Sequence, residues 1–289
     1  MSWQLWVVLS GILTGLGQSI GKSQIHKISA LQMGVLRDVT GLVVAAVLFV
    51  MVGGTWVGNA MWIGMLNGAM IAVGVALYFI AVRSSFSGSS IFGYLISQVL
   101  IVISSAFIFG EWIYFNPSSI QGLGNILVLG LTLLAMFMYS GGGAKPGGRW
   151  AWIIVISALI NVASNLIAKE IVTGSSEIWS YFLAEQTGLA FMGVMILIMR
   201  GQNMKVGWEN ARIGVLQGIV AVFGPIIYLH ILSTEPLSLA SIIRRIVAIV
   251  VTVVSGLWWY KEGKSMGLRG YASLLIGLVA FALIMIVNQ

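Results

Sequence analysis

Five charged side chains lie inside long apolar segments of this sequence: Arg37, Asp38, Glu185, Arg244 and Arg245. A charge in a segment that crosses a lipid bilayer is costly, so it usually has a partner or a function there. If the segments around 185 and 244 are helices that enter from the same membrane face, Glu185 and both arginines lie roughly 10–13 Å below that face, at 1.5 Å per residue. A pair between Glu185 and either Arg244 or Arg245 is therefore geometrically possible.

Such a pair could have one of two roles. It could only lock two helices together. Alternatively, one arginine could stay available for an anionic group on a substrate, or Glu185 could carry a coupling proton. Adjacent residues project about 100° apart on a helix, so Arg244 and Arg245 do not easily share one partner, which favours at least one of them facing a cavity.

Further polar side chains form two stripes, with a spacing of four residues along apolar segments. They are Thr14, Gln18 and Lys22 in the first stripe, and Asn161, Asn165 and Lys169 in the second. Such stripes are expected to turn inward, away from lipid. There they would either hydrogen-bond neighbouring helices or line a pore.

The remaining candidates for substrate binding or coupling are three amides and three tyrosines: Asn67, Gln98, Gln217, Tyr78, Tyr94 and Tyr228. The amides suit hydrogen bonds to a polar solute and also suit plain adhesion between helices. The tyrosines could line a pocket or belong to the aromatic belts at the membrane surfaces.

No pattern of residues indicates catalysis, a cofactor or a metal. The stretch 17–23 resembles a phosphate-binding loop, but it has three residues between its glycines where the motif needs four. Cys is absent, and His26 and His230 are far apart without other ligands nearby in sequence. We therefore expect a protein that is not an enzyme.

The elements that must position these residues are apolar helices. Only 8% of the 289 residues are charged, 59% are hydrophobic, and the mean hydropathy is +1.01, whereas soluble proteins carry roughly 25% charged residues. Ten segments approach the roughly 20 apolar residues that a spanning helix needs, namely 3–24, 30–52, 57–82, 87–108, 118–139, 150–168, 177–199, 210–231, 237–259 and 266–287. The expected fold is an all-α membrane protein with ten transmembrane helices.

The two halves of the chain repeat one another. Residues 63–68 (IGMLNG) match 213–218 (IGVLQG), and polar positions align in the same order elsewhere, such as Ser10 with Ser157 and Glu111 with Glu262. We predict repeats at 1–140 and 150–289, joined by a flexible linker at 141–149. Because five helices per repeat is an odd number, the second repeat would be inverted, as in many secondary transporters.

Positive charge is concentrated on one set of connections between the segments. Eleven of the 15 lysines and arginines lie there: Lys22, Lys27, Arg83, Lys145, Arg149, Arg200, Lys205, Arg212, Lys261, Lys264 and Arg269. The opposite side has only Lys169. Positive connections face the cytoplasm, so we expect a cell-membrane protein with both termini on the non-cytoplasmic side.

These features occur together in a known family. Beside the duplicated plan stand an arginine early in the second segment, lysines near the ends of the first and sixth, and acidic residues after the fourth and ninth: Arg37, Lys22, Lys169, Glu111 and Glu262. In this respect the chain resembles the drug/metabolite transporter superfamily, specifically its ten-helix EamA-type permeases. This chain departs from the family in one respect. Many members are drawn with both termini in the cytoplasm, whereas the charge pattern here indicates termini on the non-cytoplasmic side.

The resemblance implies a secondary carrier that works by alternating access. It also implies a central cavity lined by the first four helices of each half. We expect the substrate to be a small polar metabolite of the amino-acid or organic-acid class. Because the predicted spans contain more arginines than acidic residues, an anionic metabolite is one option. Expected partners are this solute, the lipid bilayer and, as one option, a coupling proton. Nucleic acid is not an expected partner. The sequence leaves the oligomeric state open and is compatible with a monomer.

Two other functions remain open from the sequence. An exporter of lipophilic cations would need a membrane carboxylate that no arginine neutralises, and Glu185 could supply it only in that case. A non-transporting membrane scaffold or receptor would use the polar stripes for adhesion alone.

The charge pattern makes a testable prediction about topology. A reporter that is active only in the cytoplasm should be inactive when fused after Gln289, because both termini are predicted outside the cytoplasm. Activity of that fusion would overturn the predicted orientation.

Overall fold

A computed structural model of the chain describes residues 2–22, 29–84, 88–139, 148–173, 177–203, 205–259 and 263–288. In these residues the secondary structure is helical throughout, without strands. The helices are α1 (Trp3–Lys22), α2 (Ala30–Met51), α3 (Gly58–Ser84), α4 (Gly88–Ile108), η1 (Glu111–Phe115), α5 (Ile120–Tyr139), α6 (Gly148–Val172), α7 (Ile178–Met199), α8 (Trp208–Leu232), α9 (Leu237–Trp258) and α10 (Gly263–Val287).

The described part of the chain therefore forms ten α-helices where the apolar segments predict them, with ends that agree to within four residues. Within the described residues, eight are long and apolar enough to cross a membrane. The other two are α1, which carries the polar residues Ser10, Thr14 and Gln18, and α4, in which residues 95–108 form a shorter apolar stretch. The molecule has the composition and architecture of an α-helical membrane protein.

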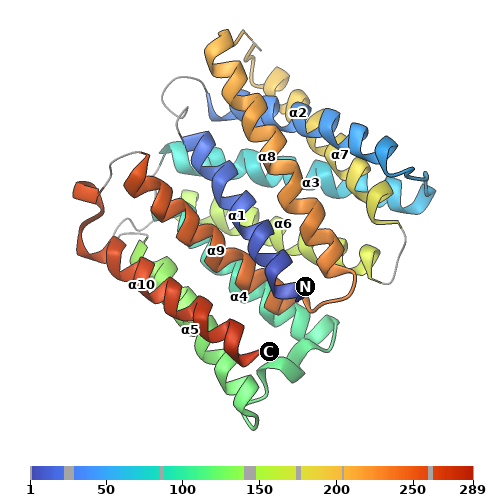
Figure 1. The fold of residues 1–289 in the computed structure, drawn as a ribbon. Helices are drawn as coiled ribbons and strands as arrows, with labels where there is room; N and C mark the ends of the chain where they lie inside the picture. Colours follow the sequence, from blue (N-terminus) through green and yellow to red (C-terminus); the bar gives the residue numbers. More distant parts are fainter. Residues whose placement is uncertain are drawn as a thin grey trace.

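The helices of the first half pack mainly on helices of the second half. In Figure 1, α2 and α7 lie at one edge of the bundle, and α5 and α10 lie together at the opposite edge. Between them, α1 packs on α8 and α9, α6 packs on α3 and α4, α2 packs on α8, and α3 packs on α7. The two termini approach each other, since Gln4 Nε2 donates a hydrogen bond to the Asn288 carbonyl at 2.6 Å.

Two reciprocal hydrogen bonds join these halves. Ser10 Oγ on α1 donates to the Gly224 carbonyl on α8 at 2.7 Å. Ser157 Oγ on α6 donates to the Gly74 carbonyl on α3 at 2.9 Å. Ser10 aligns with Ser157 in the sequence repeat, and Gly74 aligns with Gly224, so the two bonds exchange when the halves are exchanged.

Glycines bring helix backbones into direct contact, as small residues do between membrane helices. A methyl group on Gly68 of α3 would collide with the Glu185 carbonyl of α7, and one on Gly188 of α7 would collide with the Met65 carbonyl. Between α8 and α2, a methyl group on Gly218 of α8 would lie 2.6 Å from the Arg37 carbonyl of α2. The glycines therefore fix the positions of the helix turns that carry Glu185 and Arg37.

Local sequence sets the ends of several elements. Ser29 caps α2 through a reciprocal capping box with Gln32. The short helix η1 lies between two predicted segments and was not predicted from the sequence. It begins after Gly110, whose φ of 70° lies in the left-handed region that favours glycine.

The close α3–α7 contact can be tested by a matched pair of glycine substitutions. Gly68→Ala should destabilise the purified protein by about 1–3 kcal/mol, because the added methyl group forces α3 away from α7. Gly130→Ala, on an exposed face of α5 with nothing within 4 Å, should leave stability unchanged or slightly raised. Thermal unfolding in detergent measures both, and equal effects would contradict the close contact.

Candidate functional site

An arginine cluster lies where α1, α8 and α9 meet. The guanidinium of Arg244 on α9 lies over the ring of Tyr228 on α8, 4.3 Å from its centroid. Thr14 Oγ1 on α1 accepts from Arg244 Nε at 3.3 Å and from Nη2 at 3.2 Å. Tyr228 is 4% exposed, so the arginine is held by a cation–π contact inside the bundle.

A carboxylate cluster lies between α3 and α7. Asn67 Nδ2 on α3 donates to Glu185 Oε2 at 2.9 Å and to the Tyr181 hydroxyl oxygen at 2.6 Å. Tyr181 also hydrogen-bonds Glu185, one turn further along α7. All three side chains are buried. In the described residues, Asn67 and Tyr181 make the hydrogen bonds of this carboxylate.

The charged groups of the two clusters attract each other but do not form an ion pair. The charges of Glu185 and Arg244 attract each other, yet among the described contacts no ion pair joins them. The pair that the sequence suggests between Glu185 and Arg244 is therefore not closed in this structure. Each charge instead has hydrogen-bonding partners of its own.

Close helix crossings place both clusters. Gly68 and Gly188 set α3 against α7, which brings Asn67 to Glu185. On α1, a methyl group on Gly11 would lie 2.9 Å from the Arg244 carbonyl, and one on Gly15 would lie 2.8 Å from the Ala248 carbonyl. Thr14 lies between these glycines, so the same crossing delivers its hydroxyl to Arg244.

Four predicted amides carry an oxygen that has no hydrogen-bond partner among the described atoms: Asn67, Gln98, Asn161 and Gln217. The amide nitrogens of three of them are used. Asn67 binds Glu185, Gln98 donates to Ser241 Oγ at 3.0 Å, and Gln217 donates to the Gly17 carbonyl at 3.0 Å. A buried acceptor without a donor is unfavourable, so the interior has acceptor capacity for N–H or O–H groups of a bound solute or of water.

Other predicted candidates lie elsewhere. Arg37 pairs with its neighbour Asp38, with Nη2 and Oδ1 2.6 Å apart. Gln18 is exposed, and it accepts a hydrogen bond from Thr252 of α9 at 3.4 Å. Asn165 donates to the Asn161 carbonyl one turn back on its own helix, at 2.7 Å.

The last three candidates are Arg245, Tyr78 and Tyr94. Arg245 is half-buried on α9, and its charge acts on Tyr228. The side chains of Tyr78 and Tyr94 lie outside the described residues.

Sequence reasoning missed two members of the site. Tyr181 was detectable, because it lies four residues before Glu185 and therefore on the same face of α7. Ser241 is not among the predicted candidates, and nothing in its spacing indicates that it accepts from Gln98.

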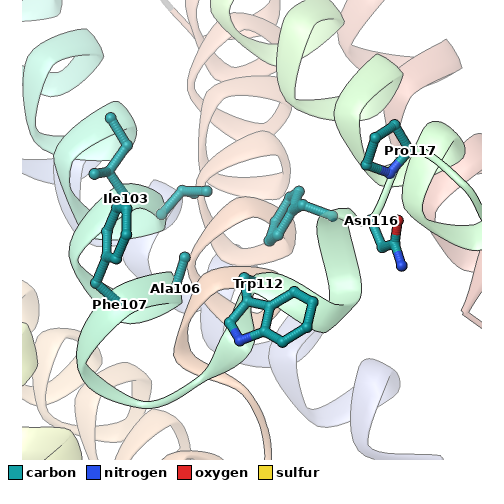
Figure 2. A pocket seen from close by; sticks show the side chains of 8 residues that line it. Ile103, Ala106, Phe107, Trp112, Asn116 and Pro117 are labelled. Carbon is teal, nitrogen blue, oxygen red and sulfur yellow. The ribbon is translucent and has the colours of Figure 1, made fainter.

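Two hollows of the described residues lie apart from these clusters. A hollow of about 320 Å³ opens on the outside of α4 and η1, and Figure 2 shows Ile103, Phe107 and Trp112 around it, with Asn116 and Pro117 at its edge. Its lining is apolar, as suits contact with lipid chains. A much smaller hollow of about 10 Å³ adjoins Asp38 between α2, α3 and α7.

Metal ligation finds no support in the described residues, since no group of three His, Cys, Asp or Glu side chains comes together there.

Comparison with known proteins supports the fold alone. No family model matches the chain, and no curated protein matches it. A crystal structure of another protein superposes with a TM-score of 0.75 and covers 97% of this chain and 95% of the other, at 12% sequence identity. The overall arrangement therefore occurs in an experimentally determined protein of nearly the same extent.

The Asn67–Glu185 contact predicts a pattern of stabilities. Asn67→Leu should lower the free energy of unfolding by about 1–3 kcal/mol, because it leaves the buried Glu185 carboxylate without its amide donor. The double variant Asn67→Leu/Glu185→Leu should lose less than that single variant, because both polar partners are then gone. Thermal unfolding of four proteins, the natural one, Asn67→Leu, Glu185→Leu and the double variant, measures the coupling. Simple addition of the two losses would contradict the contact.

Proposed function

We propose that the protein is a secondary transporter that moves a small polar metabolite with an anionic group across the cell membrane by alternating access. One observation carries the proposal. Arg244 is held inside the bundle by Tyr228 and Thr14, opposite Glu185 but not paired with it. If Arg244 and Glu185 neutralised each other in an ion pair, neither charge would be left to bind a solute. In this structure the two opposite charges are held apart, so Arg244 can bind one.

The choice of an anionic group follows from the donors that Arg244 has left. A guanidinium has five N–H donors arranged as a fork that matches carboxylate and phosphate oxygens. Thr14 and Tyr228 take up only part of them. Arg37 contributes no excess charge, because Asp38 neutralises it, so the excess of arginine over acid is confined to α9. An amino acid or an organic acid fits this arrangement.

Alternating access would rest on two inverted five-helix repeats, which we place at 1–140 and 150–289. The reciprocal bonds of Ser10 and Ser157 support this plan, because each half donates one and accepts one. The helix pairing supports it as well: exchanging α1 with α6, α3 with α8 and α4 with α9 converts the α1–α8 and α1–α9 contacts into the α6–α3 and α6–α4 contacts. In transporters of this kind the substrate lies near the midplane, where the repeats meet.

The alternative of a lipophilic-cation exporter meets one of its conditions, because no ion pair joins Glu185 to Arg244 among the described contacts, but its other conditions are less well supported. Such a protein would present an open carboxylate and free aromatic faces to its substrate. Here Asn67 and Tyr181 hold Glu185, and Arg244 covers the ring of Tyr228. The proposal also takes the protein to be a carrier and not an enzyme, with both termini on the non-cytoplasmic side.

Ligand binding tests the function. Purified protein should be stabilised in a thermal-shift panel by at least one metabolite with a carboxylate or phosphate group, by about 2.7 kcal/mol when the ligand is at 100 times its Kd. Arg244→Gln should lose this stabilisation. The control Arg200→Gln, which removes an exposed charge at the end of α7, should keep it. Stabilisation only by cations, or by no metabolite, would contradict the proposal.

A further inference from the structure

Two buried, oppositely charged side chains hold the turn between α8 and α9. The ammonium group of Lys169, near the end of α6, donates to the carbonyls of Leu232 and Glu235, both at 2.8 Å. Lys169 is only 7% exposed. It thus binds one carbonyl that the last turn of α8 leaves without an intrahelical partner, that of Leu232, and one carbonyl of the turn that follows.

Glu111 holds the other side of this turn. Its carboxylate accepts from the backbone N–H of Leu237 at 2.7 Å and from that of Ser238 at 2.8 Å. Pro236 precedes them at the start of α9 and has no N–H of its own. Glu111 is 4% exposed and is the first residue of η1, so this short helix positions its carboxylate.

The signs of both charges match the helix ends that they bind. The C-terminus of α8 carries partial negative charge and receives a lysine, and the N-terminus of α9 carries partial positive charge and receives a glutamate. Lys169 and Glu111 also attract each other. A buried charge is tolerated only with such compensation, so the turn is held firmly while these contacts exist.

The position of this turn gives the contacts their significance. Tyr228 lies one turn before the end of α8, and Arg244 lies about 10 Å into α9 at 1.5 Å per residue. The turn therefore joins the two helices that carry the arginine cluster. It lies on the same side of the bundle as the termini, because α8 and α9 connect there (Figure 1).

We propose that Lys169 and Glu111 form a latch that closes the arginine cluster toward the face of the termini. This proposal rests on the proposed transport function. Opening would break the four hydrogen bonds and move the α8–α9 turn away from η1 and α6. Near the membrane surface, water can take over the freed donors and acceptors, so such bonds exchange at a modest net cost.

A static cap would stabilise the turn without controlling access, so the test must measure access. The natural chain has no cysteine, and Ser241→Cys places a single buried thiol one turn inside α9. Its rate of reaction with a membrane-impermeant thiol reagent is measured in intact cells and in everted vesicles. Ser2→Cys, exposed beside the N-terminus, identifies which preparation presents the face of the termini.

Removing either latch charge should open this face. In the Ser241→Cys background, Glu111→Gln and Lys169→Gln should each raise the labelling rate from the face of the termini at least tenfold. The matched control is Glu170→Gln, which removes an exposed charge next to Lys169 on the same helix and should not change the rate. Equal rates in Glu111→Gln and Glu170→Gln would overturn the latch.

Two further measurements keep the result decisive. If the neutral variants do not fold, Glu111→Asp retains the charge but shortens its reach, and it should raise labelling several-fold; an unchanged rate would overturn the latch. The assay needs no substrate. Faster labelling in a protein that binds no metabolite would therefore support the latch while rejecting transport, and unchanged labelling in a protein that binds one would reject the latch alone.

Discussion

The lack of water in the hydrocarbon core of a bilayer is the constraint on which the rest of this structure depends. There, each polar group must find its partner within the protein. Amide and phenol groups hold the Glu185 carboxylate, and a ring and a hydroxyl hold the Arg244 guanidinium. Near the surface of the bundle, Lys169 and Glu111 satisfy the helix ends of the α8–α9 turn. The charged side chains named here are therefore held at places that neighbouring helices build for them.

The same constraint explains why glycine is so prominent at these places. Helices in lipid associate through close packing and not through the hydrophobic effect, and small residues allow their backbones to touch. Gly68 sets the α3 backbone against that of Glu185, and Gly218 sets α8 against Arg37. Short side chains such as Asn67 and Thr14 can reach across only because the helices approach this closely. Packing and chemistry thus depend on the same crossings.

Much of the fold could be predicted because it follows from length and apolar composition. All ten α-helices of the described residues lie in predicted segments. The site was less predictable, because the partner of a buried charge depends on how two helices align in space. Hence Arg37 pairs with its own neighbour, Glu185 binds an amide and a phenol, and η1 was missed because five residues are too few to show a helical period.

The central claim is that the separated charges of Glu185 and Arg244 receive a solute that the protein carries across the membrane. Counterflow in proteoliposomes, with a ligand found by thermal shift, tests it most directly. Radiolabelled ligand should accumulate in vesicles preloaded with the unlabelled compound when they contain the natural protein, and should not accumulate with Arg244→Gln. Binding without any counterflow, or equal counterflow in both proteins, would contradict the claim.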